Sequence, residues 1–189
     1  MDAIRFQGDE TVLDVACGTG ELERRLLDRW PGLRILGADL SFGMLDQAVS
    51  KEHRHRVGWL QAESIRLPFP EESFDCCICA NSFHYFRSPH ACLAEIRRVL
   101  RPAGTLILVD WCDDYLSCKL CSFWLRFTQR AFYRMYSRQS CHRLIERAGF
   151  RVQRFERFRI NWLWGLMRFV CQPACVTESC LTDDRGLPA

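Results

Sequence analysis

Short apolar runs alternate with segments of helical period over the first 110 residues. Each run is continuously apolar, as in strands that are buried on both faces of a sheet. The segments between the runs place apolar residues three and four positions apart, which predicts helices with one buried side. This order favours a parallel sheet covered by helices. The predicted strands are Thr11–Val15, Arg34–Ala38, Val57–Gln61, Phe74–Ala80 and Thr105–Asp110, and the clearest predicted helices are Glu21–Arg29 and Pro89–Leu100.

The pattern continues with two more helices and two more strands. Tyr115–Tyr136 is rich in aromatic residues and is predicted to be helical, and the helix after it is capped by Ser137 and ended by Gly149. Arg151–Ile160 and Leu166–Cys171 are predicted strands, close enough along the chain to pair antiparallel. We therefore predict an α/β protein in three layers, with a seven-stranded, mostly parallel sheet and an antiparallel last strand.

Composition limits the domain count, the compartment and the partners. The 189 residues, 48% of them apolar, suit one domain at residues 1–173, followed by a polar tail at 174–189 that we expect to be disordered. A formal net charge of +3 does not indicate a nucleic-acid binder. Twelve cysteines without a secretory segment indicate reduced thiols, mostly used for packing, and a cytoplasmic protein. No apolar stretch reaches the roughly 18 residues of a membrane span.

Residues 12–20, Val-Leu-Asp-Val-Ala-Cys-Gly-Thr-Gly, join the first predicted strand to the first predicted helix. Open α/β sheets bind ligands at such a junction, where Gly18 and Gly20 let the backbone approach a ligand closely. Dinucleotide enzymes also use glycine pairs, but the third glycine of their fingerprint would fall at Glu23. Asp14 adds an acid within the strand. A ligand with an ammonium and a sulfonium gains from that carboxylate, whereas a diphosphate does not.

Asp39 ends the second predicted strand, about 20 residues beyond the glycines. A carboxylate at this position can accept hydrogen bonds from both hydroxyls of a ribose. The alternative is a cap for the helix that begins near Phe42, a role for which Ser41 is equally suited. Together with the acid of the first strand, Asp39 favours S-adenosylmethionine as the ligand of this loop.

Five ordered segments resemble those of class I S-adenosylmethionine-dependent methyltransferases. Within that class, the chain is most similar to the type 11 branch that is grouped with ubiquinone and menaquinone biosynthesis methyltransferases. The resemblance covers Thr11–Asp110 and implies a Rossmann-like methyltransferase fold, S-adenosyl-L-methionine as cofactor and methyl transfer as reaction. The segments are residues 12–20, Gly-Ala-Asp-Leu-Ser at 37–41, Leu-Pro-Phe at 67–69, Ser-Phe-Asp at 73–75 and Arg-Val-Leu-Arg-Pro-Ala-Gly at 98–104.

The resemblance also implies which residues contact the cofactor. Glu63 stands where the family usually has an aspartate that contacts the adenine amino group. Ala103 replaces the first glycine of the Pro-Gly-Gly turn that is usual in the family. This change should affect the conformation of the turn more than the methyl-transfer reaction. The implied cofactor residues are Asp14, Gly18 and Gly20 for the methionine part, Asp39 for the ribose, Leu40, Met44 and Glu63 for the adenine, and also Ala16 and Asn81.

Methyl transfer from a sulfonium mainly requires that the acceptor be oriented, which can lower the barrier by about 7 to 11 kcal/mol. A base is needed only when the acceptor loses a proton. His84, in the stretch Asn-Ser-Phe-His-Tyr after the fourth predicted strand, is the candidate base, and Asp110 is a second candidate. The alternative for His84 is a hydrogen-bonded histidine packed near aromatic residues.

The acceptor is expected to be a small molecule, lipid-like or aromatic. The chain lacks the Asn-Pro-Pro-Tyr segment that clamps planar amino groups and a Pro-Cys segment for attack on a pyrimidine. Arginines repeat every four residues through Arg126–Arg138, which suits either an anionic head group at a membrane surface or a solvated helix face. Cys118 and Cys121 are spaced for a soft metal, but helix packing is the favoured interpretation, and no metal is expected.

Two other functions are considered. About ten residues precede Thr11, where family members carry a helical lid, so a cofactor-binding module without activity is one alternative. The aromatic segment after Asp110 could replace that lid, and a truncated gene model would equally explain the short start. A nicotinamide-dependent oxidoreductase is the other alternative, disfavoured by the absent third glycine.

Overall fold

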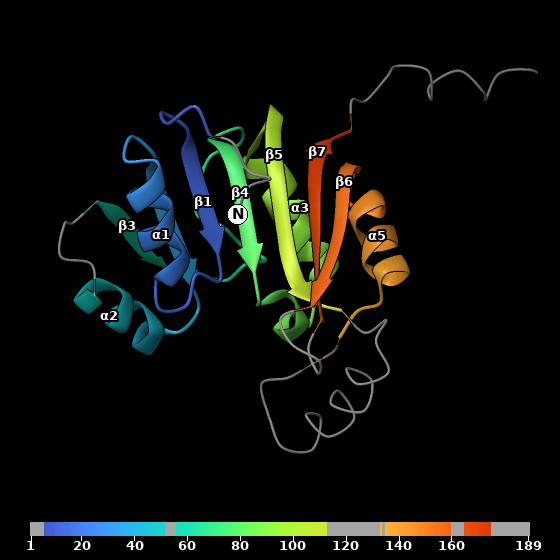
Figure 1. Ribbon diagram of the computed structural model, residues 1–189, viewed down its shortest axis with the longest axis horizontal. Coiled ribbons are helices and arrows are strands. Elements are labelled where there is room, and N and C mark those ends of the chain that lie inside the picture. The colour runs from blue at the N-terminus through green and yellow to red at the C-terminus, as the bar shows by residue number, and fades with distance from the viewer. Residues whose placement is uncertain (1–5, 52–55, 113–132, 134, 160–164, 175–189) are drawn as a thin grey trace, which may run out of the picture.

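The computed structural model describes residues 6–51, 56–112, 133, 135–159 and 165–174. These residues form a sheet in the strand order β3-β2-β1-β4-β5-β7-β6, with helices on both faces (Figure 1). Neighbouring strands are parallel except at β7, which is antiparallel to β5 and to β6, as predicted. The strands are β1 (Thr11–Val15), β2 (Arg34–Asp39), β3 (Val57–Gln61), β4 (Phe74–Ala80), β5 (Leu100–Trp111), β6 (Phe150–Arg159) and β7 (Gly165–Pro173).

Helices cover the two faces of this sheet. Pro89 starts its helix at the first turn, and the Ser137 hydroxyl accepts a hydrogen bond from the Ser140 amide at the start of the last helix. Gly149, with a φ of 80°, follows the end of that helix. In Figure 1, α1 lies in front of the sheet and α3 lies behind it. The helices are α1 (Glu21–Arg29), α2 (Phe42–Lys51), the 3-10 helix η1 (Phe83–Tyr85), α3 (Pro89–Val99) and α5 (Arg138–Arg147).

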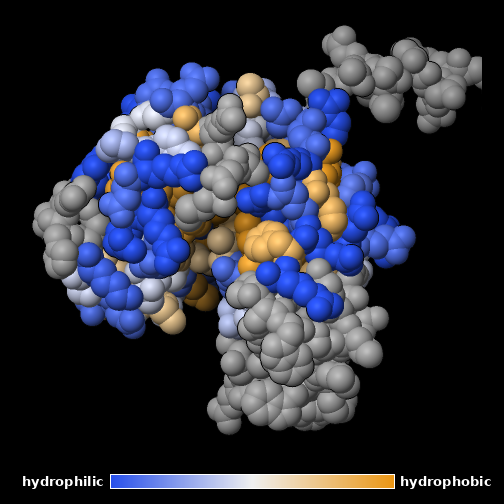
Figure 2. Space-filling model, viewed as in Figure 1, coloured by the Kyte–Doolittle hydropathy of each residue, from blue (hydrophilic) through white to orange (hydrophobic). Residues whose placement is uncertain are grey.

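Apolar side chains fill both sides of the sheet. Successive residues of a strand point to opposite faces, so Val12 packs with Leu26 of α1 while Leu13 belongs to the cluster that includes α3 and α5. By the same alternation, Asp14 points to the face that α1 covers. Figure 2 shows this side of the molecule, where hydrophilic residues cover α1 and hydrophobic residues lie exposed beside it. The fold therefore places an acid between the end of β1 and α1.

The junction of α3 and β5 differs from the prediction. β5 begins at Leu100 and not at Thr105, and α3 ends one residue earlier than predicted, at Val99. Leu100 is extended, with φ −85° and ψ 134°, and it pairs with Phe74 before the register between β4 and β5 shifts. This register shift lets β5 begin directly after α3. Hydrophobic periodicity does not reveal a register shift, so the early start of β5 was not predicted.

The predicted helix Tyr115–Tyr136 is only partly described, because residues 113–132 and 134 lie outside the described residues. At its end, Tyr136 forms a parallel bridge with Cys112, so a helix through Tyr136 is wrong. Ser137 is extended, with φ −72° and ψ 157°, which separates this segment from α5. Tertiary pairing with Cys112, just beyond the end of β5, overrides the helical propensity at this point.

The arginine series does not form one helical face. Arg138 is the first residue of α5, beyond the extended residue, and its guanidinium carbon lies 4.5 Å from the centre of the Phe155 ring. The prediction of a single stripe through Arg138 is therefore wrong. Three arginines of the series, Arg126, Arg130 and Arg134, the Cys118 and Cys121 pair, and residues 175–189 of the predicted tail lie outside the described residues.

The described cysteines other than Cys17 pack in the core, as predicted for most of them. Cys76, Cys77 and Cys79 are at most 3% exposed and carry free thiols. Burial raises the pKa of each of these thiols, which keeps them protonated at neutral pH. Over the described ranges, no helix is both long enough and apolar enough to cross a membrane.

Candidate functional site

The loop between β1 and α1 turns through three left-handed residues. Ala16, Gly18 and Gly20 have φ values of 61°, 59° and 74°. The amides of Ala16 and Cys17 both donate to the Ala38 carbonyl, at 2.7 and 3.1 Å, which fixes the loop to β2. A left-handed alanine costs about 1 kcal/mol or more, so these contacts hold Ala16 in a conformation that favours glycine. Strain of this kind is typical of ligand-binding loops.

The two glycines of the loop have different surroundings. A Cβ at Gly20 would lie 2.5 Å from the Trp59 ring, whereas a Cβ at Gly18 would meet no atom within 4 Å. Gly20 therefore lets the indole of β3 pack against the loop. Gly18 instead leaves open space beside the backbone.

Gly20→Ala should destabilise the protein more than Gly18→Ala. Both variants place an alanine in the left-handed region, at a cost of about 1 kcal/mol or more. Only alanine at position 20 also collides with Trp59, which should add about 1 to 3 kcal/mol. Urea denaturation of the two variants measures the difference in the free energy of unfolding. Equal losses would contradict a packing role for Gly20.

Asp39 holds the same loop from the end of β2. Its Oδ2 accepts the Gly18 amide and its Oδ1 accepts the Ser41 amide, each at 2.8 Å. The Ser41 hydroxyl accepts the Met44 amide at 3.4 Å, so Ser41 provides the side-chain cap of α2. An ionised carboxylate has about four lone-pair sites, which leaves Asp39 able to accept further hydrogen bonds at this edge.

Asp14 lies at the bottom of a hollow beside the loop. The strand register places it between Gly37 of β2 and Ile78 of β4. It is 2% exposed, and among the described residues none donates a hydrogen bond to its Oδ1. Burial raises the pKa of Asp14 well above its usual value, and the Glu23 carboxyl raises it further. A buried acid without a donor suits a cationic ligand group. The hollow, of about 300 Å³, is lined by Asp14, Cys17, Thr19, Glu21, Leu22, Arg25, Ala80 and Asn81.

Glu23 is a buried acid of the site whose role the sequence did not predict. It is 0% exposed, and within the described part of the chain neither of its carboxyl oxygens has a hydrogen-bond donor. It lies three and four positions before Leu26 and Leu27, on the buried side of α1. An acid inside an apolar stripe is the signal that could have identified it.

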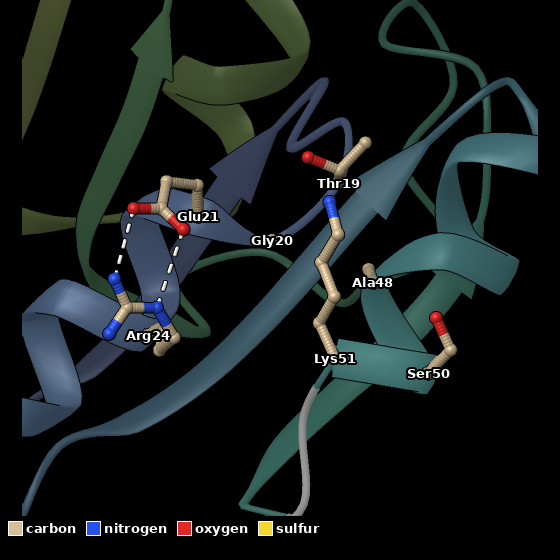
Figure 3. A pocket seen from close by; sticks show the side chains of 7 residues that line it. All are labelled: Thr19, Gly20, Glu21, Arg24, Ala48, Ser50 and Lys51. Carbon is tan, nitrogen blue, oxygen red and sulfur yellow. Dashed lines mark hydrogen bonds and ion pairs between the residues drawn. The ribbon is translucent and has the colours of Figure 1, made fainter.

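A second hollow, of about 310 Å³, lies between the start of α1 and the end of α2 (Figure 3). In Figure 3 the Lys51 side chain points toward Thr19, and Glu21 is bonded to Arg24. Arg24 also pairs with Asp28, at 3.1 Å. Of the predicted cofactor residues, only Gly20 lines this hollow, so it does not coincide with the predicted site.

The residues predicted to face the adenine lie just after β2, in the first turn of α2 and just after β3. Leu40 and Met44 are 63% and 43% exposed, so both present apolar surface to a ligand. The Ala62 amide donates to the Asp39 carbonyl at 3.0 Å, which brings the segment of Glu63 beside the end of β2. Glu63 is exposed. The structure thus gathers these positions at the edge that carries Asp39.

A buried histidine meets a buried aspartate where β4 and β5 end. The Asn81 amide donates to the Val109 carbonyl at 2.8 Å and joins the two strand ends. His84 Nδ1 lies 2.6 Å from Asp110 Oδ1, and the His84 amide donates to Asp110 Oδ2 at 2.7 Å. Both side chains are 1% exposed. The two candidate bases therefore form one pair, although 26 positions separate them along the chain.

These contacts define what the pair can do chemically. An ionised Asp110 accepts a hydrogen bond from Nδ1–H of His84, which makes Nε2 the basic atom of the imidazole. The Trp111 ring stacks on the imidazole, with the two ring centres 4.1 Å apart. The centre of the Tyr85 ring lies 4.0 Å from the centre of the imidazole. The arrangement suits a base held in one orientation, and it equally suits a packed histidine.

Comparisons with known proteins agree on one family. Residues 13–108, slightly more than half of the chain, match the family model described as a methyltransferase domain. The chain is 37% identical over 113 residues to a demethylmenaquinone methyltransferase of Thermus thermophilus, covering 59% of this chain and 51% of that protein. It is also 37% identical over 116 residues to the ubiquinone/menaquinone biosynthesis C-methyltransferase UbiE of Paracoccus denitrificans, covering 59% and 46%. A malonyl-[acyl-carrier protein] O-methyltransferase of Hahella chejuensis is 36% identical over 98 residues, covering 52% and 35%. The alignments thus span about half, or less, of these relatives.

Solved structures share the fold. A candidate methyltransferase from Bacillus halodurans superimposes with a TM-score of 0.80 at 17% identity, covering 92% of this chain and 96% of that one. An S-adenosylmethionine-dependent methyltransferase from Methanosarcina mazei has a TM-score of 0.75 at 17% identity, covering 89% and 94%. The matched region runs from the glycine loop to β5 and contains the hollow, Asp39 and η1. The chain therefore belongs to the class I methyltransferase family, whose cofactor is S-adenosyl-L-methionine.

Proposed function

We propose that this chain transfers a methyl group from S-adenosyl-L-methionine to a small-molecule acceptor. The observation that supports this most is the hollow in which Asp14 is buried without a donor to its Oδ1 in the described residues, next to the open side of Gly18. A cofactor with a cationic amino-acid end complements this carboxylate. A nicotinamide dinucleotide brings a diphosphate instead, which these acids would repel, so the oxidoreductase alternative is not proposed.

Each part of the loop has a role in this proposal. Asp14 would attract the ammonium of the methionine part, and the left-handed loop would admit the ligand without side chains in its way. Asp39 would accept hydrogen bonds from the ribose hydroxyls through its remaining lone pairs. The bound cofactor supplies a methyl group that its positive sulfur has already activated. The other proposed contacts are Ala16, Gly18, Gly20 and Asn81 near the methionine part, and Leu40, Met44 and Glu63 near the adenine.

The His84–Asp110 pair favours an acceptor that loses a proton. Relatives of this chain are named for two kinds of reaction. One is methylation of demethylmenaquinone, or C-methylation in ubiquinone and menaquinone biosynthesis, and the other is O-methylation of a malonyl-[acyl-carrier protein]. A carboxylate loses no proton when it is methylated and needs no base. A ring carbon of a hydroxylated aromatic exchanges a proton for the methyl group, which a held imidazole can assist. We therefore propose a hydroxylated, quinol-like aromatic acceptor.

The proposed chemistry assigns one task to each residue of the pair. His84 Nε2 would take the proton of the acceptor hydroxyl while the ring carbon accepts the methyl group. It would return a proton to that oxygen once the ring carbon has lost its own proton to solvent. Asp110 would hold the imidazole in the required orientation through its 2.6 Å contact with Nδ1. The sum is one methyl group gained and one proton lost by the acceptor.

Methyl-labelled S-adenosylmethionine tests this proposal with the full chain. We expect label in a reduced, short-chain demethylmenaquinone and in no malonyl thioester offered beside it. Label in the malonyl carboxylate would contradict the acceptor class while supporting methyl transfer. Cofactor binding without any labelled product, in these acceptors and in a host metabolite extract, would favour the non-catalytic module.

A further inference from the structure

Asp14 and Glu23 face each other between β1 and α1. They are 2% and 0% exposed, and none of the described residues donates a hydrogen bond to Asp14 Oδ1 or to either oxygen of Glu23. The two carboxyls are nevertheless within hydrogen-bonding reach of one another. A carboxylate only accepts hydrogen bonds, so a bond between the two exists only when one of them carries a proton.

The ionisable groups acting on this pair from the neighbouring elements are acids and thiols. Asp39 of β2 adds a negative charge to both carboxyls. Cys17 of the loop and Cys76 of β4 are thiols whose pKa burial and the nearby acids raise, so they stay neutral. Arg25 lines the hollow, but its guanidinium is bonded to Glu21 at 2.8 Å. None of these contacts supplies the pair with a cation.

Two adjacent buried carboxylates strongly resist being ionised together. Burial raises the pKa of Glu23 to about 7 and holds the pKa of Asp14 well above its usual value. The pair is therefore poised to lose a proton near neutral pH when positive charge arrives. Asp14 also reaches the hollow, whereas Glu23 does not line it.

We propose that Asp14 and Glu23 share a proton until the cofactor binds, and that this proton passes to solvent when the cofactor's ammonium enters the hollow beside Asp14. One positive charge enters and one leaves, so the buried site keeps its charge. Glu23 acts through Asp14 and is a positioning residue for the cofactor. This inference rests on the proposed function, since the cofactor brings the cation.

Proton release decides the sign of the pH dependence. Lower pH adds protons that the cofactor must displace, so affinity should rise with pH, by up to about tenfold per pH unit below about pH 7, where the free pair still holds its proton. Above about pH 7 the free pair has already lost this proton, so the rise flattens. Above about pH 8 the ligand's own α-amino group begins to lose its charge, which lowers the affinity.

Isothermal titration calorimetry in buffers of different ionisation enthalpy counts the released protons directly. At about pH 6.5, the wild-type chain should release about 0.5 to 1 proton per S-adenosylmethionine or S-adenosylhomocysteine bound. It should release none on binding 5′-methylthioadenosine, which lacks the ammonium. Glu23→Gln keeps a donor toward Asp14 but does not titrate, so it should bind without proton release. Asp28→Asn, an exposed acid of the same helix, is the matched control and should behave as the wild type.

The outcomes separate this inference from the function on which it rests. Equal proton release in the wild type and Glu23→Gln, or equal release with and without the ammonium, overturns the inference while leaving cofactor binding intact. The ligand comparison needs only the wild-type chain and stays decisive if Glu23→Gln fails to fold. Absence of any binding of S-adenosylmethionine overturns the proposed function as well.

Discussion

Replacing His84 by glutamine should lower kcat for a proton-losing acceptor by about 10²- to 10⁴-fold, the usual contribution of a general base. Glutamine retains a donor toward Asp110 and much of the side-chain volume, so the contacts that join η1 to β5 should persist. KM for S-adenosylmethionine should change little, because His84 lies at the ends of β4 and β5 and does not line the hollow beside Asp14. Steady-state kinetics with labelled cofactor separates the two parameters.

A smaller variant distinguishes a base from a packed histidine. His84→Ala leaves a cavity beside Tyr85 and Trp111. Added imidazole should then restore part of the rate to the variant, because the missing group is the proton acceptor. Unchanged kcat in His84→Gln, or a loss in which KM alone rises, would assign His84 to packing.

Asp39→Ala should weaken S-adenosylmethionine binding by about 10- to 100-fold or more. A hydrogen bond to a charged group contributes about 1.5 to 3 kcal/mol, and the variant removes the proposed bonds to the ribose hydroxyls. It also leaves the Gly18 amide without the acceptor that holds the loop. Isothermal titration calorimetry measures the affinity, and circular dichroism should show the fold retained, because Asp39 pairs with Gln61 of β3 through its backbone, which alanine keeps.

The neighbouring serine is the matched control for Asp39. Ser41→Ala removes the hydroxyl that accepts the Met44 amide, so it should lower the free energy of unfolding by about 0.5 to 2 kcal/mol. It should leave cofactor affinity nearly unchanged, since it retains both hydrogen bonds of the aspartate. Equal affinities of Asp39→Ala and the wild-type chain would contradict the ribose assignment.

The fold was largely predictable because buried parallel strands and amphipathic helices leave strong periodic signals. Val57–Gln61 and Phe74–Ala80 are strands at the predicted bounds, and the antiparallel β7 follows from the short connection to β6. The predictions failed where local signals compete with tertiary pairing. Leu100 pairs with β4 and Tyr136 with Cys112, and neither contact leaves a trace in local composition.

The candidate site was predictable only in part. Gly18 and Gly20 were predicted as parts of the loop between β1 and α1, and Asp39 as the end of β2, because the geometry of such strand–loop–helix units depends on local sequence. Glu23 was predicted only as an acid of the first helical turn that stands in place of a third glycine. Its burial against Asp14 was not predicted, because the side of a helix on which an acid lies gains meaning only against its neighbour in the sheet. His84 and Asp110 were predicted as two separate candidates.

The sequence by itself determined the alternation of elements, the glycine loop and the family, because these depend on periodicity and on short ordered segments. Only the tertiary structure decided which acids are buried together and which histidine meets which aspartate. Asp14 and Glu23 face one another because α1 packs over β1, and His84 meets Asp110 because β4 and β5 end at the same edge. The charge of a buried group depends on its neighbours in space, and those are set by packing between distant segments.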